Sequence, residues 1–191
     1  FGASNEAGLL GTAAFDPTSA DLILIPTGGG NFLKVYYSTF TGVEGWFTEG
    51  GAPADSEPIV YTSAIYVQRR GLTDLDLVLT GAVKVDSTLV GVADDFNYIG
   101  TYPASTSLAA SGLSSSVLGT AAFDPTAADL VLIPDGAGGY DRYYYSTFTG
   151  VEGWFSEGGA PADTVALSSG IIIQRRAVSP YNALISPGFT L

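Results

Sequence analysis

The stretch Ser-Thr-Phe-Thr-Gly-Val-Glu-Gly-Trp-Phe at residues 38–47 occurs a second time, residue for residue, at 146–155. The repetition extends upstream, because residues 11–18 recur as 119–126 with the same offset of 108 residues. A fixed period of this length indicates a duplicated structural unit. The chain of 191 residues therefore predicts two tandem domains produced by an internal duplication.

The two domains are expected at residues 1–86 and 87–191. Within both, apolar side chains recur with a period of two. In residues 74–85, leucine and valine occupy one parity while aspartate and lysine occupy the other, and residues 181–191 keep the same phase. Because successive side chains of a strand point to opposite faces, this alternation predicts half-buried strands.

Two short apolar runs, at 22–25 and 130–133, predict strands that are buried on both faces. Pro26 and Pro134 are expected to end them, because proline cannot donate to a β-ladder. Turns rich in Gly and Pro separate strand-like segments about every ten residues. The predicted fold class is all-β, with two antiparallel domains resembling β-sandwiches or barrels, and helix is limited to a turn or two at 6–10 and 107–113.

One segment is not repeated. Residues 88–102, with strand-like stretches at 89–92 and 96–99, come directly before the second copy, whereas Phe1 already aligns with Ala109. The first copy is therefore expected to lack a strand, and an open sheet edge pairs readily with another chain. Either residues upstream of Phe1 have been removed, or another chain fills the gap. Head-to-tail assembly of copies is the expectation. The residues expected at assembly contacts are Phe1, Gly2, Leu9, Leu10, Leu89, Val90, Phe96, Tyr98, Phe189 and Leu191.

Composition restricts the partners. The chain carries 19 acidic and 7 basic residues, for a net charge of −12, which argues against nucleic acid and anionic membranes as partners. Its apolar runs are too short to span a bilayer. It contains no Cys, His or Met and only 14% charged residues, a composition typical of exported proteins. The expected location is extracellular or at the cell surface.

Signals for catalysis are weak. General acid–base chemistry usually uses histidine, which the chain lacks, and no Gly-x-Ser-x-Gly motif or phosphate-binding loop is present. Paired carboxylates can carry out glycoside hydrolysis, and the candidate pairs are Glu44 with Glu49 and Glu152 with Glu157. Loop acids of this kind are usually solvated, so the chain is not expected to be an enzyme.

Four aspartates recur in register, Asp16 and Asp21 in the first copy and Asp124 and Asp129 in the second. Carboxylate oxygens are calcium ligands, so these positions are candidates for a calcium site. The Asp-Pro pairs also suit simple turns. No other cofactor is expected.

The paired arginines at 69–70 and 175–176 hold four of the seven basic charges. Neighbours on a strand face opposite ways, so one arginine of each pair is expected to meet a loop acid such as Glu49 or Glu157. The alternative is that they anchor a strand end in solvent.

Aromatic residues admit two interpretations. Trp46, Trp154, Tyr37 and Tyr145 are candidates for a platform on which sugars stack, which would make the protein a bivalent carbohydrate-binding module. The alternative places the tryptophans in the core, where each would bury about 150–250 Å². The core interpretation is favoured.

A resemblance extends along nearly the whole chain. It lies in Ala-Asp-Leu-Ile-Leu-Ile at 20–25, Tyr-Tyr-Ser at 36–38, Gly-Trp at 45–46, Ile-Tyr-Val-Gln-Arg-Arg at 65–70 and Leu-Thr-Gly-Ala-Val at 79–83. This pattern resembles an uncharacterised family of secreted, strand-rich, internally duplicated proteins from verrucomicrobial bacteria. The chain departs from it by having proline after the first strand. The resemblance implies export and a repetitive β fold, and it brings no catalytic residues.

Together these observations predict a non-catalytic extracellular structural protein. The expected role is a self-assembling filament or surface-layer subunit whose neighbours are joined by strand addition. Its expected partners are copies of itself, with polysaccharide as the partner under the carbohydrate-binding alternative.

Overall fold

The computed structural model describes residues 5, 8–60, 62–73, 88–100, 106–167, 170–176 and 180–185. Its regular structure is β-strand with three short 3-10 turns, so the predicted all-β fold class is confirmed. The chain divides into unit 1 (residues 1–27, 31–60 and 65–82) and unit 2 (residues 28–30, 61–64 and 83–191). The domain boundary predicted between residues 86 and 87 lies outside the described residues, as do the predicted strand at 74–85 and residues 186–191.

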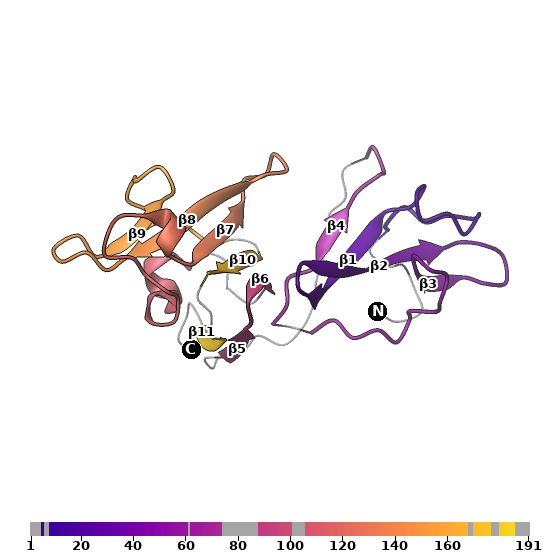
Figure 1. The fold of residues 1–191 in the computed structure, drawn as a ribbon. Helices are drawn as coiled ribbons and strands as arrows, with labels where there is room; N and C mark the ends of the chain where they lie inside the picture. The colour runs from indigo at the N-terminus through magenta and orange to yellow at the C-terminus, as the bar shows by residue number, and fades with distance from the viewer. Residues whose placement is uncertain are drawn as a thin grey trace, which may run out of the picture. The chain divides into compact units, whose positions relative to one another are not determined.

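Unit 1 is built on one four-stranded sheet with the order β3-β2-β1-β4 (Figure 1). Its strands are β1 (Leu22–Gly28), β2 (Asn31–Ser38), β3 (Gly45–Thr48) and β4 (Tyr66–Gln68). Because side chains alternate along each strand, the sheet has a core on both faces. The first face buries Ile23, Val35 and Trp46, and the second buries Leu22, Tyr36 and Phe47.

Unit 2 contains a five-stranded sheet with the order β6-β10-β7-β8-β9 and a separate pair, β11-β5. Its strands are β5 (Thr88–Val92), β6 (Asp95–Ile99), β7 (Leu130–Pro134), β8 (Tyr140–Ser146), β9 (Gly153–Ser156), β10 (Ile171–Arg175) and β11 (Tyr181–Ile185). Three 3-10 turns complete it: η1 (Ala109–Ser111), η2 (Leu113–Ser115) and η3 (Pro125–Ala127). The helical turn expected near 107–113 is therefore confirmed, and none of these turns is long enough to span a membrane.

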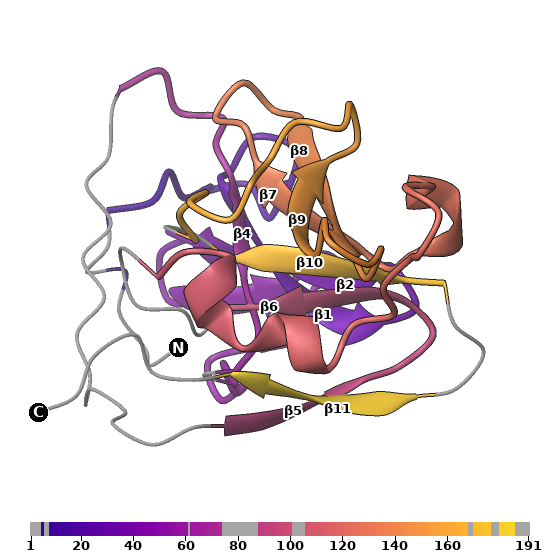
Figure 2. The ribbon, with the colours of Figure 1, turned by 90° about the vertical axis from the view of Figure 1, so that its left-hand side faces the viewer.

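The two sheets of unit 2 form a sandwich-like pair of layers (Figure 2). Val92 of β5 and Ala183 of β11 share one core with Val131 and Trp154 of the larger sheet. Leu113 of η2 is fully buried in the same core. The β5–β11 pair and η2 thus cover one face of the five-stranded sheet.

Strand β1 corrects one prediction. Pro26 does not end the strand, which continues to Gly28, whereas β7 does end at Pro134. The ladder between β1 and β4 stops at the pair Leu24–Tyr66, so Pro26 lies beyond the last residue paired on that side. A proline is tolerated in a strand where one side needs no N–H donor.

Repeated residues make repeated contacts. The N–H of Trp46 donates to Oδ1 of Asp55, and the N–H of Trp154 donates to Oδ1 of Asp163, both at 2.9 Å. Gly45 precedes Trp46 with φ of +152°, and an added Cβ would lie 3.1 Å from the Asp55 carboxylate. Glycine is therefore required before Trp46, because a side chain at residue 45 would be strained at this φ and would crowd the Asp55 carboxylate.

Candidate functional site

The candidate site is the outer edge of β4, the edge that faces away from β1. In unit 2 the corresponding strand, β10, lies inside its sheet, between β6 and β7. In unit 1, β4 pairs with β1 in the same register and is the last strand of its sheet among the described residues (Figure 1). Two strands of nearly the same sequence thus have different neighbours.

Burial follows this difference. Ile171 and Ile173 have no exposed surface, whereas their counterparts Ile65 and Val67 are only half-buried. The side chain of Arg175 is 6% exposed, whereas that of Arg69 is 29% exposed. The side chains on this face of β4 therefore remain partly in contact with solvent where their counterparts are covered.

The difference extends to β1, where Leu24 and Ile25 are half-buried and their counterparts Leu132 and Ile133 in β7 are buried, but other parts of the repeat are alike. Phe40 and Phe148, in the two copies of one loop, are 47% and 46% exposed. The tryptophans of the two copies are both buried. In unit 2 this face is covered by the β5–β11 pair and η2, so the greater exposure in unit 1 accompanies the absence of a corresponding layer among the described residues.

The backbone of β4 presents hydrogen-bonding groups at this edge. In unit 2 the side-chain amide of Asn97 donates to the carbonyl oxygen of Ile173 at 3.4 Å, which places that carbonyl on the β6 side of β10. Backbone groups of successive residues face opposite sides of a strand. The corresponding residue of β4, Val67, therefore directs its N–H and C=O away from β1.

The edge of β6 that faces away from β10 is paired with an extended segment of the chain. Residues 62–64, which belong to unit 2, run along it, with the N–H of Ala64 donating to Tyr98 O (3.4 Å) and that of Gly100 donating to Thr62 O (3.2 Å). A Cβ on Gly100 would lie 2.7 Å from Ser63 O. The five-stranded sheet of unit 2 thus accepts an extended segment along its margin, at a place where only glycine fits.

Each unit contains a buried aspartate paired with the first arginine of the repeated pair. Nε of Arg69 lies 2.9 Å from Oδ2 of Asp21, and Nη1 of Arg175 lies 2.8 Å from Oδ2 of Asp129. The expected pairing of this arginine with Glu49 or Glu157 is therefore wrong. Those glutamates instead form exposed ion pairs with Lys34 and Arg142.

Asp21 is satisfied by the protein itself. Its carboxylate accepts hydrogen bonds from the backbone N–H of Leu10, Arg70 and Gly71 as well as from Arg69. Burial opposes ionisation of Asp21, but these backbone donors and the arginine charge outweigh it and hold the pKa below its usual value. The carboxylate acts as an internal anion that ties three segments of unit 1 together.

The four aspartates predicted as a calcium site have partners within the protein, and calcium binding stays a prediction. Protein donors take up the acceptor positions of Asp21, and Asp129 accepts from Arg175, Leu118 and Arg176 in the same manner. Asp16 and Asp124 each close a turn by accepting from the N–H and hydroxyl of the threonine two residues on. Among the described residues, no three acidic side chains gather in a group suited to a metal.

The predicted assembly residues have different environments. Leu9 is buried in the core of unit 1, while Leu10 and Leu89 are exposed. Val90, Phe96 and Tyr98 are half-buried in β5 and β6. Phe1, Gly2, Phe189 and Leu191 lie outside the described residues. The edge of β4 itself, the residues 65–69, was not among the residues predicted for assembly.

The tryptophan platform is not present in this structure. Trp46 and Trp154 are 3% and 1% exposed and belong to the cores of their units, so neither offers a face to a sugar. Tyr37 and Tyr145 are half-buried, and each packs edge-on against the tryptophan of its unit. The core interpretation of the tryptophans is confirmed.

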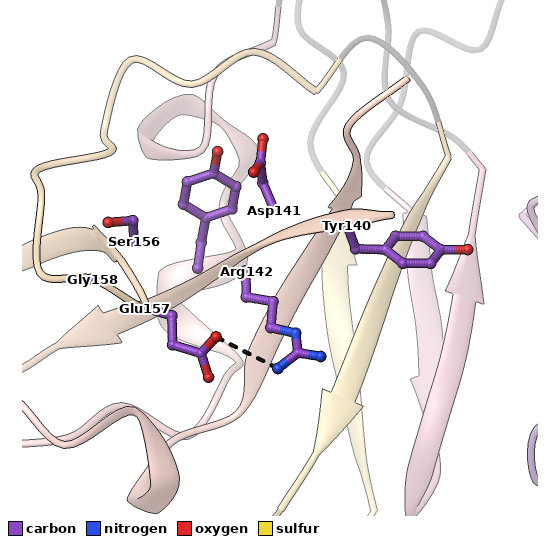
Figure 3. Close-up of a pocket in the computed structure, with 7 residues that line it drawn as sticks. Tyr140, Asp141, Arg142, Ser156, Glu157 and Gly158 are labelled. Carbon is purple, nitrogen blue, oxygen red and sulfur yellow. Dashed lines mark hydrogen bonds and ion pairs between the residues drawn. The ribbon is translucent and has the colours of Figure 1, made fainter. Parts of the chain in front are cut away.

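A pocket of about 350 Å³ lies elsewhere, where β9 ends beside β8. It is lined by Tyr140, Asp141, Arg142, Tyr143, Ser156, Glu157 and Gly158. Figure 3 shows the Arg142 and Glu157 side chains directed toward each other, while Tyr140 points away from them. The lining is not repeated in unit 1, because Leu33 stands where unit 2 has Asp141.

The acid pairs proposed for glycoside hydrolysis gain no support as a catalytic unit. Glu44 and Glu152 are exposed loop residues, and Glu49 and Glu157 are exposed partners in ion pairs with bases. A catalytic acid usually lies in an enclosed and partly apolar site, whereas these four side chains are exposed.

Comparisons with protein families, with curated proteins and with solved structures found no match to this chain. The resemblance to secreted duplicated β proteins stays a prediction. The function is therefore argued from the geometry of the two units.

Proposed function

We propose that this chain is a non-catalytic structural protein of the extracellular space or cell surface, and that it assembles by strand addition between copies. The observation that carries the proposal is the difference between β4 and β10. Strand β10 is paired on both sides, with β6 and β7, whereas β4 is paired only with β1 among the described residues. An added strand along β4 would supply hydrogen-bond partners and cover Ile65 and Val67.

Strand addition at β4 favours an open chain of subunits. The accepting surface is the edge of β4, and the donating segment lies elsewhere on the neighbouring copy, so the contact is heterologous. A heterologous contact whose rotation does not close generates a filament. A filament or layer of repeated β units is the assembly we propose.

The test is self-association of the purified chain, measured by light scattering and by negative-stain electron microscopy. Growth of filaments or ordered layers with rising concentration is expected. Val67→Pro removes the N–H that faces outward while leaving the groups that face β1, so the variant should stay folded and monomeric. A wild-type chain that remains a monomer at high concentration contradicts the proposal.

The matched control is Ile173→Pro, the same change at the repeated position. There the backbone faces β6 within the sheet, so proline should disrupt unit 2. The far-ultraviolet circular dichroism spectrum should be unchanged for Val67→Pro and reduced for Ile173→Pro. Equal unfolding of both variants would mean that Val67 does not lie at an unpaired edge of its sheet.

The pocket beside β8 supports a second candidate, a carbohydrate-binding module. Tyr140 is 39% exposed and lines the same pocket as Asp141, Arg142 and Glu157, although its ring points away from the Arg142–Glu157 pair, and an exposed aromatic ring near a polar pocket suits a sugar. Because the lining is not repeated, this module would have one such site and not two. Binding on a glycan array that is lost in Tyr140→Ala and kept in Tyr37→Ala would favour it over assembly.

A further inference from the structure

We infer that two equivalent surface sites, one on each unit, bind arginine side chains of a basic partner polypeptide. In unit 1 the site is formed by Phe15, Phe40, Val43 and Glu44, and in unit 2 by the identical residues 108 positions further along the chain. The inference goes beyond the assembly proposed above and does not depend on it, because it uses neither β4 nor its edge.

The first observation is a loop that the two units share. Residues 39–44 and 147–152 have the identical sequence Thr-Phe-Thr-Gly-Val-Glu, and every residue of both loops is exposed. Surface loops usually vary more than the elements that they connect. Here the loop is identical, whereas two buried strand positions, Ile23 and Val35, are Val131 and Tyr143 in unit 2. A shared surface role explains this identity better than packing within the units does.

The loops present apolar surface. Phe40 and Phe148 are 47% and 46% exposed, and Val43 and Val151 are 42% and 41% exposed. Single exposed apolar residues are common, but a group that recurs at the same place in both units indicates an interaction site. These few side chains cover far less than the roughly 800 Å² per partner of a stable protein–protein interface, so the site fits one side chain or a short segment.

A strained residue holds each ring pair together. Phe15 and Phe123 both have φ of +53°, a left-handed conformation that bulky residues rarely adopt. The centre of the Phe15 ring lies 5.8 Å from that of Phe40 and 5.0 Å from that of Phe47. In unit 2 the corresponding distances are 5.9 and 4.9 Å. Both units thus keep an unfavourable backbone conformation that places a second ring beside the exposed one, and such strain is concentrated at functional sites.

Each site also carries negative charge. Glu44 and Glu152 are exposed, and among the described residues neither takes part in an ion pair. Asp16 directly follows Phe15, and hydrogen bonds from Thr18 hold its pKa below the usual value. The ligand must therefore complement both an aromatic ring and a carboxylate. Arginine does so, because its apolar stem and planar guanidinium stack on aromatic rings while its charge pairs with acids.

The core of unit 2 contains the same combination with an arginine in place. There the guanidinium of Arg175 lies 4.1 Å from the centre of the Tyr181 ring, and its Nη1 lies 2.8 Å from Oδ2 of Asp129. A ring and a carboxylate thus hold an arginine within this protein. The surface sites offer a ring and a carboxylate to an arginine from outside.

The charge of the chain favours a basic partner over a second copy. The described basic residues already act on acids of their own unit: Lys34, Arg69, Arg142 and Arg175 form ion pairs, and the charges of Arg70 and Arg176 act on Asp16 and Asp124. The net charge of −12 attracts basic polypeptides and opposes contact between copies. The cation that fills these sites is therefore expected from a different polypeptide.

The probe is the peptide acetyl-Gly-Arg-Gly-Arg-Gly-amide, added to the isotopically labelled full chain at low salt, where repulsion opposes assembly. The amide resonances of Gly42 and Gly150, which lie between the Phe and Val of each site, should shift and saturate with dissociation constants on the order of 1–10 mM. The matching lysine peptide has the same charge but no planar group, so it should bind at least about threefold more weakly.

The two sites serve as controls for each other. Phe40→Leu removes the ring and keeps an apolar side chain, so binding should weaken about threefold or more at Gly42 and stay unchanged at Gly150. Phe148→Leu should do the reverse. Phe40→Tyr keeps the ring and should bind as the wild type does.

The carboxylate is tested separately, which also covers the case in which Phe40→Leu does not fold. Glu44→Gln should weaken binding at Gly42 by about twofold to fivefold. Asp94→Asn removes the same charge at another exposed position and should leave binding at Gly42 unchanged. Equal effects of these two substitutions would mean that net charge alone attracts the peptide, which would overturn the inference.

Other outcomes identify a different occupant. Equal binding of the arginine and lysine peptides, or binding that survives Phe40→Leu in a folded chain, overturns the inference. Shifts of the two glycines caused by cellohexaose and not by the arginine peptide would assign the sites to a sugar, and shifts caused by rising protein concentration alone would assign them to a second copy; either result overturns it. The Val67→Pro chain should bind the peptide as the wild type does, so failure of the proposed assembly and failure of this inference are distinguishable.

Discussion

Nη1 of Arg175 lies 2.8 Å from Oδ2 of Asp129, and both side chains are nearly inaccessible to solvent. The arginine also lies 4.1 Å from the centre of the Tyr181 ring, so it joins β10 to β11 as well as to the segment before β7. Burial, and secondarily the negative charge of Asp129, raise the pKa of the Tyr181 hydroxyl. This cluster connects the two layers of unit 2.

Asp129→Asn should destabilise unit 2 by about 3–5 kcal/mol, because it leaves a buried arginine without its counter-charge. Asp21→Asn should cost unit 1 less, about 1–3 kcal/mol, because Arg69 is partly solvated. Each unit contains one tryptophan, so fluorescence in Trp46→Phe and Trp154→Phe backgrounds reports on the units separately during urea unfolding. Equal losses in the two units would contradict this ranking.

Acid should weaken unit 1 through Asp21. The folded-state pKa of Asp21 lies below its unfolded value of about 3.9, so its contribution to stability is complete above that value and is lost as pH falls through the folded pKa. The difference in unfolding free energy between wild type and Asp21→Asn should be constant from pH 7 to about 5 and should shrink below about 4. Urea titrations across this range, followed through Trp46, provide the measurement. A difference that grows on acidification would show that Asp21 is not held ionised by its donors.

Gly170 should tolerate no side chain. A Cβ there would lie 2.6 Å from the Cβ of Ala64, so Gly170→Ala should cost about 1–3 kcal/mol through overpacking. Gly158→Ala is the control, because its nearest neighbour would be the Ser156 hydroxyl at 3.8 Å and the change should be within about 0.5 kcal/mol of neutral. Urea unfolding followed through Trp154 distinguishes them, and similar effects of the two substitutions would argue against a tight contact at residues 62–64.

The buried tryptophans should be protected from collisional quenchers. Acrylamide should quench Trp46 and Trp154 far less than a free indole, and Trp154→Ala should destabilise unit 2 by about 3–5 kcal/mol. Strong quenching of native protein by iodide would contradict the packing described here and would reopen the sugar-platform interpretation.

Salt should promote assembly. Copies that each carry a net charge of −12 repel one another, and the screening length falls from about 30 Å at 0.01 M salt to about 10 Å at 0.1 M. Light scattering should therefore show a shorter lag and a lower critical concentration at the higher salt. Assembly that weakens with added salt would indicate that ion pairs between copies, and not an apolar edge, hold the subunits together.

Much of the fold could be predicted from local pattern. The apolar run before Pro134 identifies β7, because burial on both faces of a strand leaves a continuous run of apolar side chains. The extension of β1 past Pro26 was not predictable from the same rule, because it depends on which neighbour lies beside the strand at that point.

The charge pairing required the sheet register. Asp21 directly precedes β1 and Arg69 directly follows β4, and the pairing of Leu22 with Gln68 brings them together across 48 positions of chain. The only local signal was that both residues recur at the edges of their strands in the second copy. A search for acids and bases that flank repeated strands could have found this pair, whereas proximity in sequence favoured Glu49.

The segment at residues 62–64 has a consequence for dissecting the protein. A fragment cut at the junction of the two repeats, beginning at residue 87, would contain every strand of unit 2 yet lose the piece of backbone that lies along Tyr98 and Gly100. Such a fragment would expose the unpaired edge of β6 to solvent and is expected to be less soluble than the intact chain. Limited proteolysis between the repeats would have the same effect, so the integrity of the second half depends on residues contributed by the first.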